Sequence, residues 1–303
     1  MPALLQKINA DFLDEKMVQL YLFRDDLNTP IVDNPHIAGN KWRKLKYNIQ
    51  KAKEENHDTL LTMGGAYSNH IHATAAAGKA FNLKTIGLIR GEEHLPLNPT
   101  LQFAVENNMQ IHYIKRSKYR SQREHILLDQ LEQEYGKCYY LPEGGTNNLA
   151  IKGCTEILND ININPNYICC PCGTGGTISG IIASSKSNQK VIGFPALKGD
   201  FLSKEVENLL QNYQNSIPKN WQLCTDYHFG GYAKIKPQLI NFIKEFKQTQ
   251  NIPLDPIYTG KMLFGIYDLI KKDHFPKESI ILAIHTGGLQ AIAGFNQRLG
   301  VDL

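Results

Sequence analysis

The sequence of 303 residues lacks a long hydrophobic run, a dense set of cysteines and a strong excess of charge of one sign. No stretch approaches the roughly 20 apolar residues that cross a bilayer, and residues 1–16 carry acids at Asp11, Asp14 and Glu15 but no apolar core of signal-peptide length. We therefore expect a cytoplasmic protein without a membrane partner. The formal net charge of +4 comes from 33 basic and 29 acidic residues of mixed order, which gives no reason to expect nucleic-acid binding.

Cysteine is sparse, and only three of the six cysteines fall close together, at Cys169, Cys170 and Cys172. The chain has no second cluster of metal ligands, and adjacent residues of a strand point to opposite faces. His70 and His72 are two residues apart, which does not place them on one face of a helix. We expect buried free thiols, no disulfide framework and no metal site.

The composition, 42% hydrophobic and 20% charged, is that of an ordinary soluble globular protein with room for two domains. Short apolar segments alternate with amphipathic ones along most of the chain, which predicts alternating strands and helices. Strands are expected at 18–23, 59–63, 84–89, 110–114, 138–141, 167–171, 190–194, 222–226 and 280–285. Helices are expected at 44–54, 69–81, 101–107, 124–134, 149–158, 201–212, 236–248, 261–271 and 289–298, and another begins near Thr177.

This alternation predicts an α/β fold in which parallel sheets are flanked by helices and ligands collect at the carboxyl ends of the strands. A glycine-rich break at 142–148 divides the pattern. We expect a small α/β domain at 48–145, inserted in a large domain formed by 1–47 and 146–303.

Lys41 follows a Gly-Asn pair and precedes the helical segment at 44–54. A rigid loop at this place could aim the amine at a ligand, although a basic cluster at a helix start is more often a solvated face. The rest of the chain favours the first interpretation. A glycine-rich loop and a Thr-Gly-Gly near the end of the chain would supply two further contacts for a phosphorylated aldehyde cofactor. Lys41 would then bind that cofactor covalently.

The glycine-rich loop is Cys-Gly-Thr-Gly-Gly-Thr-Ile-Ser-Gly at 172–180, between an apolar strand and a helix. Its backbone N–H groups and the positive end of the helix dipole could bind a phosphate. It is not a Walker A loop, and Ile178 stands where a dinucleotide fingerprint needs its third glycine. An ordinary strand-to-helix turn is the alternative.

Two further strand ends carry polar groups beside glycines. At 64–70, Ser68 or Asn69 can cap a helix while nearby amides face an anion such as a substrate carboxylate. At 284–289, the hydroxyl of Thr286 could hydrogen-bond a ring nitrogen. Tyr232 and Tyr258 also stand near glycines and could line a pocket. Plain capping, glycine turns and ordinary tyrosine packing are the alternatives.

Together these motifs resemble the pyridoxal-phosphate enzymes of the tryptophan synthase β-like fold (fold type II), and most closely the D-cysteine desulfhydrase and 1-aminocyclopropane-1-carboxylate (ACC) deaminase family. The resemblance spans nearly the whole chain and rests on the order and approximate spacing of the segments 24–26, 39–45, 64–70, 142–145, 173–177, 255–261 and 285–288. It implies a two-domain fold, pyridoxal 5′-phosphate as cofactor, a small amino acid as substrate and a homodimer.

The resemblance also implies a role for each candidate residue. Lys41 looks like the Schiff-base lysine, Asn69 like the partner of the cofactor's 3′-hydroxyl and Thr286 like the partner of its pyridine nitrogen. The implied cofactor-binding residues are Lys41, Asn69, Gly173, Thr174, Gly175, Gly176, Thr177 and Thr286. The implied catalytic residues are Lys41, Ser68 and Tyr258, with Lys44 as a second candidate base, and the implied substrate-binding residues are Ser68, Asn69, His70, Tyr232 and Tyr258.

Two positions bear on the reaction. ACC deaminases carry Glu after the tyrosine that Tyr258 matches, and Leu where this chain has Thr286. The residues here are Thr259 and Thr286, a hydroxyl pair similar to the desulfhydrase pattern, which implies that D-cysteine is converted to pyruvate, sulfide and ammonia. ACC deamination to 2-oxobutanoate, a β-replacing synthase and a non-catalytic ligand-binding homologue remain alternatives. Tyr67 departs from the family, which usually has Gln before the serine that Ser68 matches.

Overall fold

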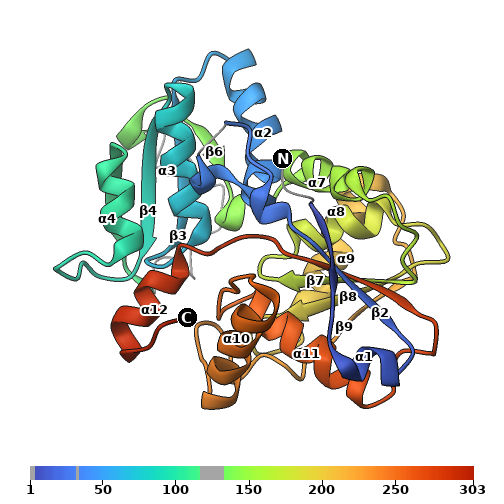
Figure 1. Ribbon diagram of the computed structural model, residues 1–303. Helices are drawn as coiled ribbons and strands as arrows, with labels where there is room; N and C mark the ends of the chain where they lie inside the picture. Colours follow the sequence, from blue (N-terminus) through green and yellow to red (C-terminus); the bar gives the residue numbers. More distant parts are fainter. Residues whose placement is uncertain (1–3, 32–33, 117–132) are drawn as a thin grey trace.

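The computed structural model describes residues 4–31, 34–116 and 133–303, and their strands form two sheets (Figure 1). The larger sheet has the order β1-β2-β10-β7-β8-β9 and the smaller one the order β5-β4-β3-β6. All paired strands are parallel except β1 and β2. The strands of the larger sheet are β1 (Leu5–Ile8), β2 (Gln19–Phe23), β7 (Tyr167–Cys172), β8 (Lys190–Pro195), β9 (Trp221–Leu223) and β10 (Ile280–Ile284). Those of the smaller sheet are β3 (Thr59–Gly65), β4 (Lys84–Arg90), β5 (Met109–Ile114) and β6 (Tyr139–Leu141).

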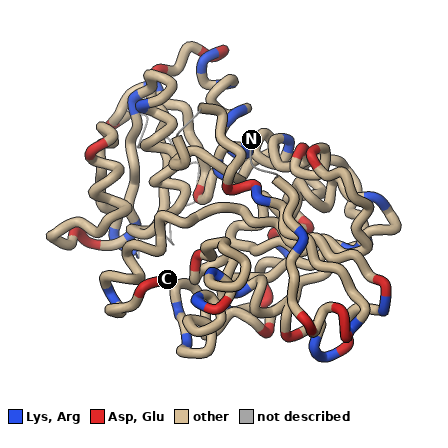
Figure 2. Tube along the Cα trace, viewed as in Figure 1, with Lys and Arg blue, Asp and Glu red and all other residues tan. Residues whose placement is uncertain are grey.

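Helices flank both sheets (Figure 1), so the predicted α/β fold with parallel sheets covered by helices is confirmed. The described helices are α1 (Asp11–Glu15), α2 (Gly39–Glu54), α3 (Asn69–Phe81), α4 (Pro99–Glu106), α7 (Asn148–Thr155), α8 (Gly176–Ser184), α9 (Phe201–Gln214), α10 (Pro237–Gln250), α11 (Thr259–Lys271) and α12 (Ala291–Leu299). Basic and acidic residues are interspersed along this framework (Figure 2). No helix within the described residues is both long and apolar enough to cross a bilayer.

The cysteines of β7 show why this strand lies inside the larger sheet. Cys169 packs in the core on one face, whereas Cys170 and Cys172 pack in the core on the other face. All three are buried free thiols, as expected. A strand that is apolar on both faces is typical of a parallel sheet covered on both sides. Within the described residues, no group of three or more His, Cys, Asp or Glu side chains is placed to hold a metal ion.

The strands of the smaller sheet all fall between residues 59 and 141. Helix α2 runs across the predicted boundary at 47/48, and α12 near the chain's end returns to lie against α4 beside the smaller sheet (Figure 1). The domain limits 1–47 with 146–303 and 48–145 stay a prediction.

Several element boundaries differ from the sequence-based expectation. The helix expected at 44–54 begins at Gly39, so Lys41 lies in the first turn of α2 and not in a loop. The strand expected at 222–226 ends at Leu223, and α12 begins at Ala291, two residues late. The short β1 and α1 were not predicted, because four or five residues are too few to show a recognisable hydrophobic period. The helix expected at 124–134 lies largely outside the described residues.

The start of α2 has a steric cause. Gly39 has a φ of 67°, and a Cβ built on it would lie 2.6 Å from the carbonyl oxygen of Thr286. The Gly-Asn pair was interpreted as a turn, but the glycine is required because α2 begins against the backbone that follows β10. This close approach brings Lys41 and Thr286 to the same place.

Candidate active site

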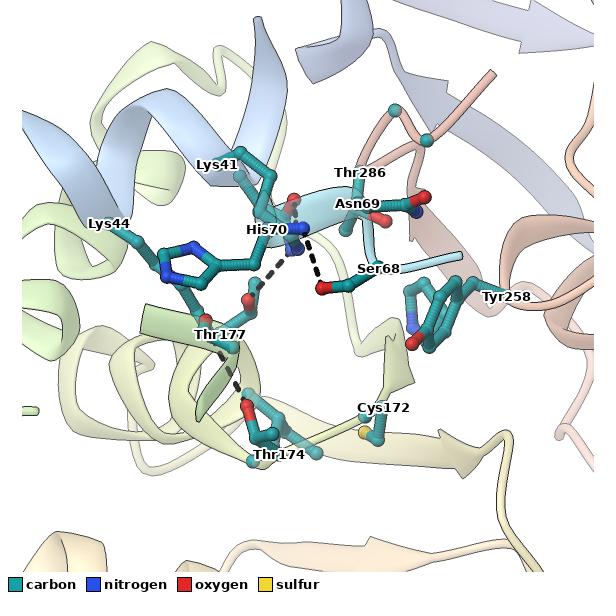
Figure 3. Close-up of a pocket in the computed structure, with 18 of the residues that line it drawn as sticks. Lys41, Lys44, Ser68, Asn69, His70, Cys172, Thr174, Thr177, Tyr258 and Thr286 are labelled. Atoms are coloured by element: carbon teal, nitrogen blue, oxygen red, sulfur yellow. Dashed lines mark hydrogen bonds between the residues drawn. The ribbon is translucent and has the colours of Figure 1, made fainter. Parts of the chain in front are cut away.

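The residues singled out from the sequence gather in one pocket at the carboxyl ends of β3, β7 and β10 (Figure 3). The pocket encloses about 620 Å³ of empty space, including its open mouth. Of the predicted site residues, those that line it are Lys41, Ser68, Asn69, His70, Gly173, Thr174, Gly175, Thr177, Tyr232, Tyr258 and Thr286. Gly176 is not in the lining; it opens α8 directly behind the glycine-rich loop. The pocket therefore joins segments that are up to about 245 residues apart in the chain.

Four helices, α2, α3, α8 and α11, begin at this pocket. A helix start carries the positive end of a dipole, but at α3 and α11 side chains already accept hydrogen bonds from the first N–H groups. Ser68 caps α3, since its Oγ accepts hydrogen bonds from the N–H groups of His70 at 3.2 Å and Ile71 at 3.3 Å. Among the described residues, no carboxylate lines the pocket. Such a site favours anionic ligands.

Lys41 holds its amine inside this positive pocket. Its Nζ donates a hydrogen bond to Oδ1 of Asn40 at 3.1 Å, and Nδ2 of Asn40 donates to Oγ1 of Thr177 at 3.0 Å. Desolvation in the pocket and then the nearby ammonium of Lys44 lower the pKa of Lys41 to about 7. A large fraction of the amine is therefore neutral and nucleophilic near pH 7.

Lys44 lies at the glycine-rich loop. Its Nζ donates to the carbonyl oxygen of Gly144 at 3.0 Å, to Oγ1 of Thr146 at 3.0 Å and to Oγ1 of Thr174 at 3.4 Å. A Cβ built on Gly176 would lie 3.0 Å from this Nζ, so the ammonium faces the positive start of α8. An ammonium beside a helix N-terminus is unfavourable unless an anion joins them.

The glycine-rich loop leaves room for that anion. Gly175 has a φ of 88° and is the N-cap of α8. A Cβ on Gly173 would lie 3.3 Å from the ring and the hydroxyl of Tyr258, so a larger residue here would push this tyrosine away from the loop. The loop, the helix start and Lys44 fit a phosphate, and Lys41 in the same pocket supplies an amine for an aldehyde. The chain thus fits a phosphorylated aldehyde such as pyridoxal 5′-phosphate.

Tyr258 and Tyr232 form one side of the pocket. Their rings pack edge to face with centroids 6.2 Å apart. Desolvation, and after it the neighbouring Tyr232 and Asp255, raises the pKa of Tyr258 well above its usual range, so its phenol stays protonated. Asp255 is buried and caps α11, accepting hydrogen bonds from the N–H groups of Ile257, Tyr258 and Thr259.

The expectation that Thr259 and Thr286 both place a hydroxyl in the site is wrong for Thr259. Its Oγ1 donates to Oδ2 of the buried Asp255 at 2.7 Å, and the side chain does not line the pocket. Only Thr286 of the two threonines reaches the site, where it lies near Asn69 (Figure 3). Gly288 makes this approach possible, because a Cβ on it would lie 2.6 Å from Nδ2 of Asn69.

His70 and Tyr67 lie differently from the other candidates. His70 touches the pocket, but its ring is buried, and its Nε2 is 2.9 Å from Oγ1 of Thr62. Burial holds the pKa of His70 well below its usual range, so the ring is neutral. Tyr67 is 45% exposed, does not line the pocket and lies near α12, where a Cβ built on Gly294 would be 3.6 Å from its ring. The role of His70 in binding substrate stays a prediction.

Two supporting contacts were not assigned from the sequence. Arg43 donates from Nε to Oδ1 of the buried Asp25 at 2.8 Å and from its other end to Asp160 at 3.0 Å, which fixes the turn of α2 that carries Lys41 and Lys44. Asn40 links Lys41 to Thr177, as described above. The signal for the first contact was the Arg-Asp-Asp motif at 24–26, whose two acids bind Arg43 and Arg24.

Known proteins resemble this chain over most of its length. The family model described as "Pyridoxal-phosphate dependent enzyme" matches residues 8–287. A protein of Arabidopsis thaliana named "Bifunctional D-cysteine desulfhydrase/1-aminocyclopropane-1-carboxylate deaminase, mitochondrial" is 32% identical over 297 residues, which are 89% of this chain and 72% of that protein. A protein of Pyrococcus abyssi (strain GE5 / Orsay) named "Putative 1-aminocyclopropane-1-carboxylate deaminase" is 30% identical over 297 residues, which are 93% of this chain and 88% of that protein.

A similar fold has been solved. The structure described as "Crystal Structure Analysis of the ACC deaminase homologue" has a TM-score of 0.81 and 24% identity, and covers 97% of this chain and 92% of that one. The pocket chemistry, the family match and the fold agree. This chain belongs to the pyridoxal-phosphate dependent enzymes, in the group that includes D-cysteine desulfhydrases and ACC deaminases, and its cofactor is pyridoxal 5′-phosphate.

Proposed function

We propose that this enzyme converts D-cysteine and water to pyruvate, hydrogen sulfide and ammonia. The observation that carries the proposal is the amine of Lys41, with a pKa of about 7, in a pocket that also holds the amine of Lys44 and the start of α8 and that no described carboxylate lines. Such a pocket suits a substrate carboxylate as well as a cofactor phosphate. The neutral amine can also accept a proton.

The polar groups of the pocket support the arrangement of the cofactor that the resemblance implies. Lys44 and the N–H groups of residues 173–177 would hold the phosphate, Asn69 the ring hydroxyl and Thr286 the ring nitrogen. When bound, pyridoxal 5′-phosphate supplies an aldehyde that joins amines covalently and a ring that takes up negative charge from the substrate's Cα. Lys44 was a second candidate for the base, but its contacts at the glycine-rich loop support a phosphate-binding role instead.

The opposite side of the pocket would hold the amino acid. The start of α3 offers the positive end of its dipole and the polar side chains of Ser68 and Asn69 to the substrate carboxylate. Lys41, with its amine free and neutral, would remove the proton from Cα of the bound substrate. The protonated phenol of Tyr258 would lie beside the substrate's side chain and donate a hydrogen bond to the departing sulfur.

Two features support D-cysteine over ACC. ACC has no Cα proton for Lys41 to remove, so another group would have to attack the ring, and the raised pKa of Tyr258 leaves little phenolate to act as that base or nucleophile. Thr286 offers the ring nitrogen a hydroxyl and not a carboxylate, which tunes the ring less strongly and suits a good leaving group such as sulfide. ACC deamination to 2-oxobutanoate and ammonia is the second candidate, because the Pyrococcus abyssi relative is named "Putative 1-aminocyclopropane-1-carboxylate deaminase".

The test is to supply the purified enzyme, saturated with cofactor, with D-cysteine, L-cysteine and ACC. The proposal predicts equal amounts of sulfide and pyruvate from D-cysteine, and much slower turnover of L-cysteine and ACC. Faster release of 2-oxobutanoate from ACC would support the second candidate. Suppression of pyruvate by an added thiol or amine acceptor would indicate a β-replacing synthase, and no product from any substrate would favour a ligand-binding homologue. The homodimer and the cytoplasmic location stay predictions, which gel filtration and cell fractionation can check.

A further inference from the structure

Lys261, in the first turn of α11, carries an amine in an unusual environment. Its side chain is 2% exposed, and its Nζ donates to the backbone carbonyl oxygens of His228 and Gly231, each at 2.8 Å, and of Ala196 at 3.5 Å. Within the described part of the chain, Lys261 forms no ion pair. Buried lysines are rare and are usually paired with a carboxylate. Here backbone carbonyls take the place of that carboxylate, as they do around a bound monovalent cation.

Two of these carbonyls belong to a loop that needs support. In residues 228–234 the backbone is left-handed at Phe229 (φ 56°), Gly230 (φ 101°), Gly231 (φ 119°) and Ala233 (φ 54°). Phe229 and Ala233 pay a steric cost for this conformation because they carry a Cβ. The loop's own hydrogen bonds are local: Gly230 N–H donates to Nδ1 of His228, and Gly231 N–H donates to the carbonyl oxygen of His228. Lys261 adds contacts from outside the loop.

The same loop carries one wall of the active site. Tyr232 follows Gly231 directly and lines the pocket with its ring against Tyr258. Tyr258 is the N-cap of α11, three residues before Lys261. One helix start therefore places Tyr258 in the pocket and, through Lys261, holds the loop of Tyr232 beside it.

We propose that Lys261 is a positioning residue that serves as a built-in monovalent cation: its ammonium gathers the carbonyls of the 228–234 loop and holds Tyr232 where the substrate's side chain binds. The inference rests on the proposed function for its effect on the substrate. The effect of Lys261 on the 228–234 loop is expected in the protein without substrate as well. Because the cation is part of the chain, turnover by the native enzyme does not depend on whether sodium, potassium or ammonium salts are present.

The test uses two variants that remove the ammonium in different ways. Lys261→Ala leaves a space beside the three carbonyls, and ammonium ion can enter it; Lys261→Met removes the charge but fills the space. In sodium chloride, both variants are expected to raise KM for the active substrate about tenfold or more, with kcat changed less than about threefold. Ammonium chloride should restore KM for Lys261→Ala and leave Lys261→Met impaired. Lys271→Ala, at the other end of α11, is the matched control and should behave as the native enzyme in both salts.

Hydrogen exchange gives a readout that does not need turnover. Amides of residues 228–234 should exchange faster in Lys261→Ala than in the native enzyme, and ammonium chloride should slow them again. If the native enzyme acts on none of the three substrates, the proposed function fails, and the exchange result still decides the role of Lys261. Should Lys261→Ala not fold, Lys261→Met provides the exchange comparison. Unchanged exchange in this loop, or a defect of Lys261→Ala that sodium and ammonium salts leave the same, would overturn the proposal.

Discussion

Lys41 and Lys44 lie three residues apart in α2, and both amines line the same pocket (Figure 3). Desolvation comes first and the charge of Lys44 second among the causes that lower the pKa of Lys41 to about 7. The two lysines therefore have different roles. Lys44 supplies positive charge at the glycine-rich loop, and Lys41 has an amine that is partly neutral near pH 7. This division leads to predictions for each lysine.

The pH dependence of cofactor capture should follow the pKa of Lys41. Only the neutral amine attacks an aldehyde, so in the cofactor-free enzyme the rate of capture should rise about tenfold per pH unit below pH 7 and level off above about pH 8. A lysine with an ordinary pKa near 10.5 would give a rate that still climbs at pH 9. Stopped-flow absorbance after mixing with pyridoxal 5′-phosphate, from pH 6 to 9, separates these outcomes.

Lys44→Met should weaken binding of pyridoxal 5′-phosphate by about 10- to 100-fold, because the loop loses a charged donor to the phosphate. Binding of pyridoxal, which has no phosphate, should weaken less, because it loses only the effect of Lys44 on the pKa of Lys41. Equilibrium titrations of both ligands test this difference. Lys51→Met is the control on the same helix, since Lys51 pairs with Glu55 on the surface. Equal losses for the two ligands would contradict a phosphate role for Lys44.

Gly39→Ala tests whether the start of α2 must touch the backbone of Thr286. The left-handed φ of 67° costs about 1–2 kcal/mol for alanine, and the contact of 2.6 Å adds a cost for overpacking of about 1–3 kcal/mol. Gly300→Ala is the matched control, because Gly300 has a φ of 63° but no atom within 4 Å of a built Cβ. Urea unfolding should show the larger loss of free energy for Gly39→Ala. Equal losses would mean that this close approach does not constrain the site.

The sequence predicted the layered α/β fold and most of the residues that line the pocket, because alternating apolar strands and glycine-rich strand ends are local patterns. Contacts between residues far apart in the chain could not be predicted from the sequence. Lys41 was assigned to a loop because Gly39 suggests a turn, and only the approach of Thr286 explains why a helix begins there. Thr259 was paired with Thr286 by type, but the buried Asp255 takes its hydroxyl. Lys261 was quoted only as part of a motif, because its three acceptors are backbone carbonyls from residues 30 to 65 positions away.

The most direct measurement is to reduce the cofactor-loaded enzyme with borohydride and locate the attached cofactor by peptide mass spectrometry. We predict one modified peptide, with the added mass on Lys41. In Lys41→Ala no peptide should carry that mass, and release of pyruvate from D-cysteine should fall by about a thousandfold or more. Attachment to another lysine, such as Lys44, or native turnover by Lys41→Ala would contradict the assignment of Lys41 on which the proposed function rests.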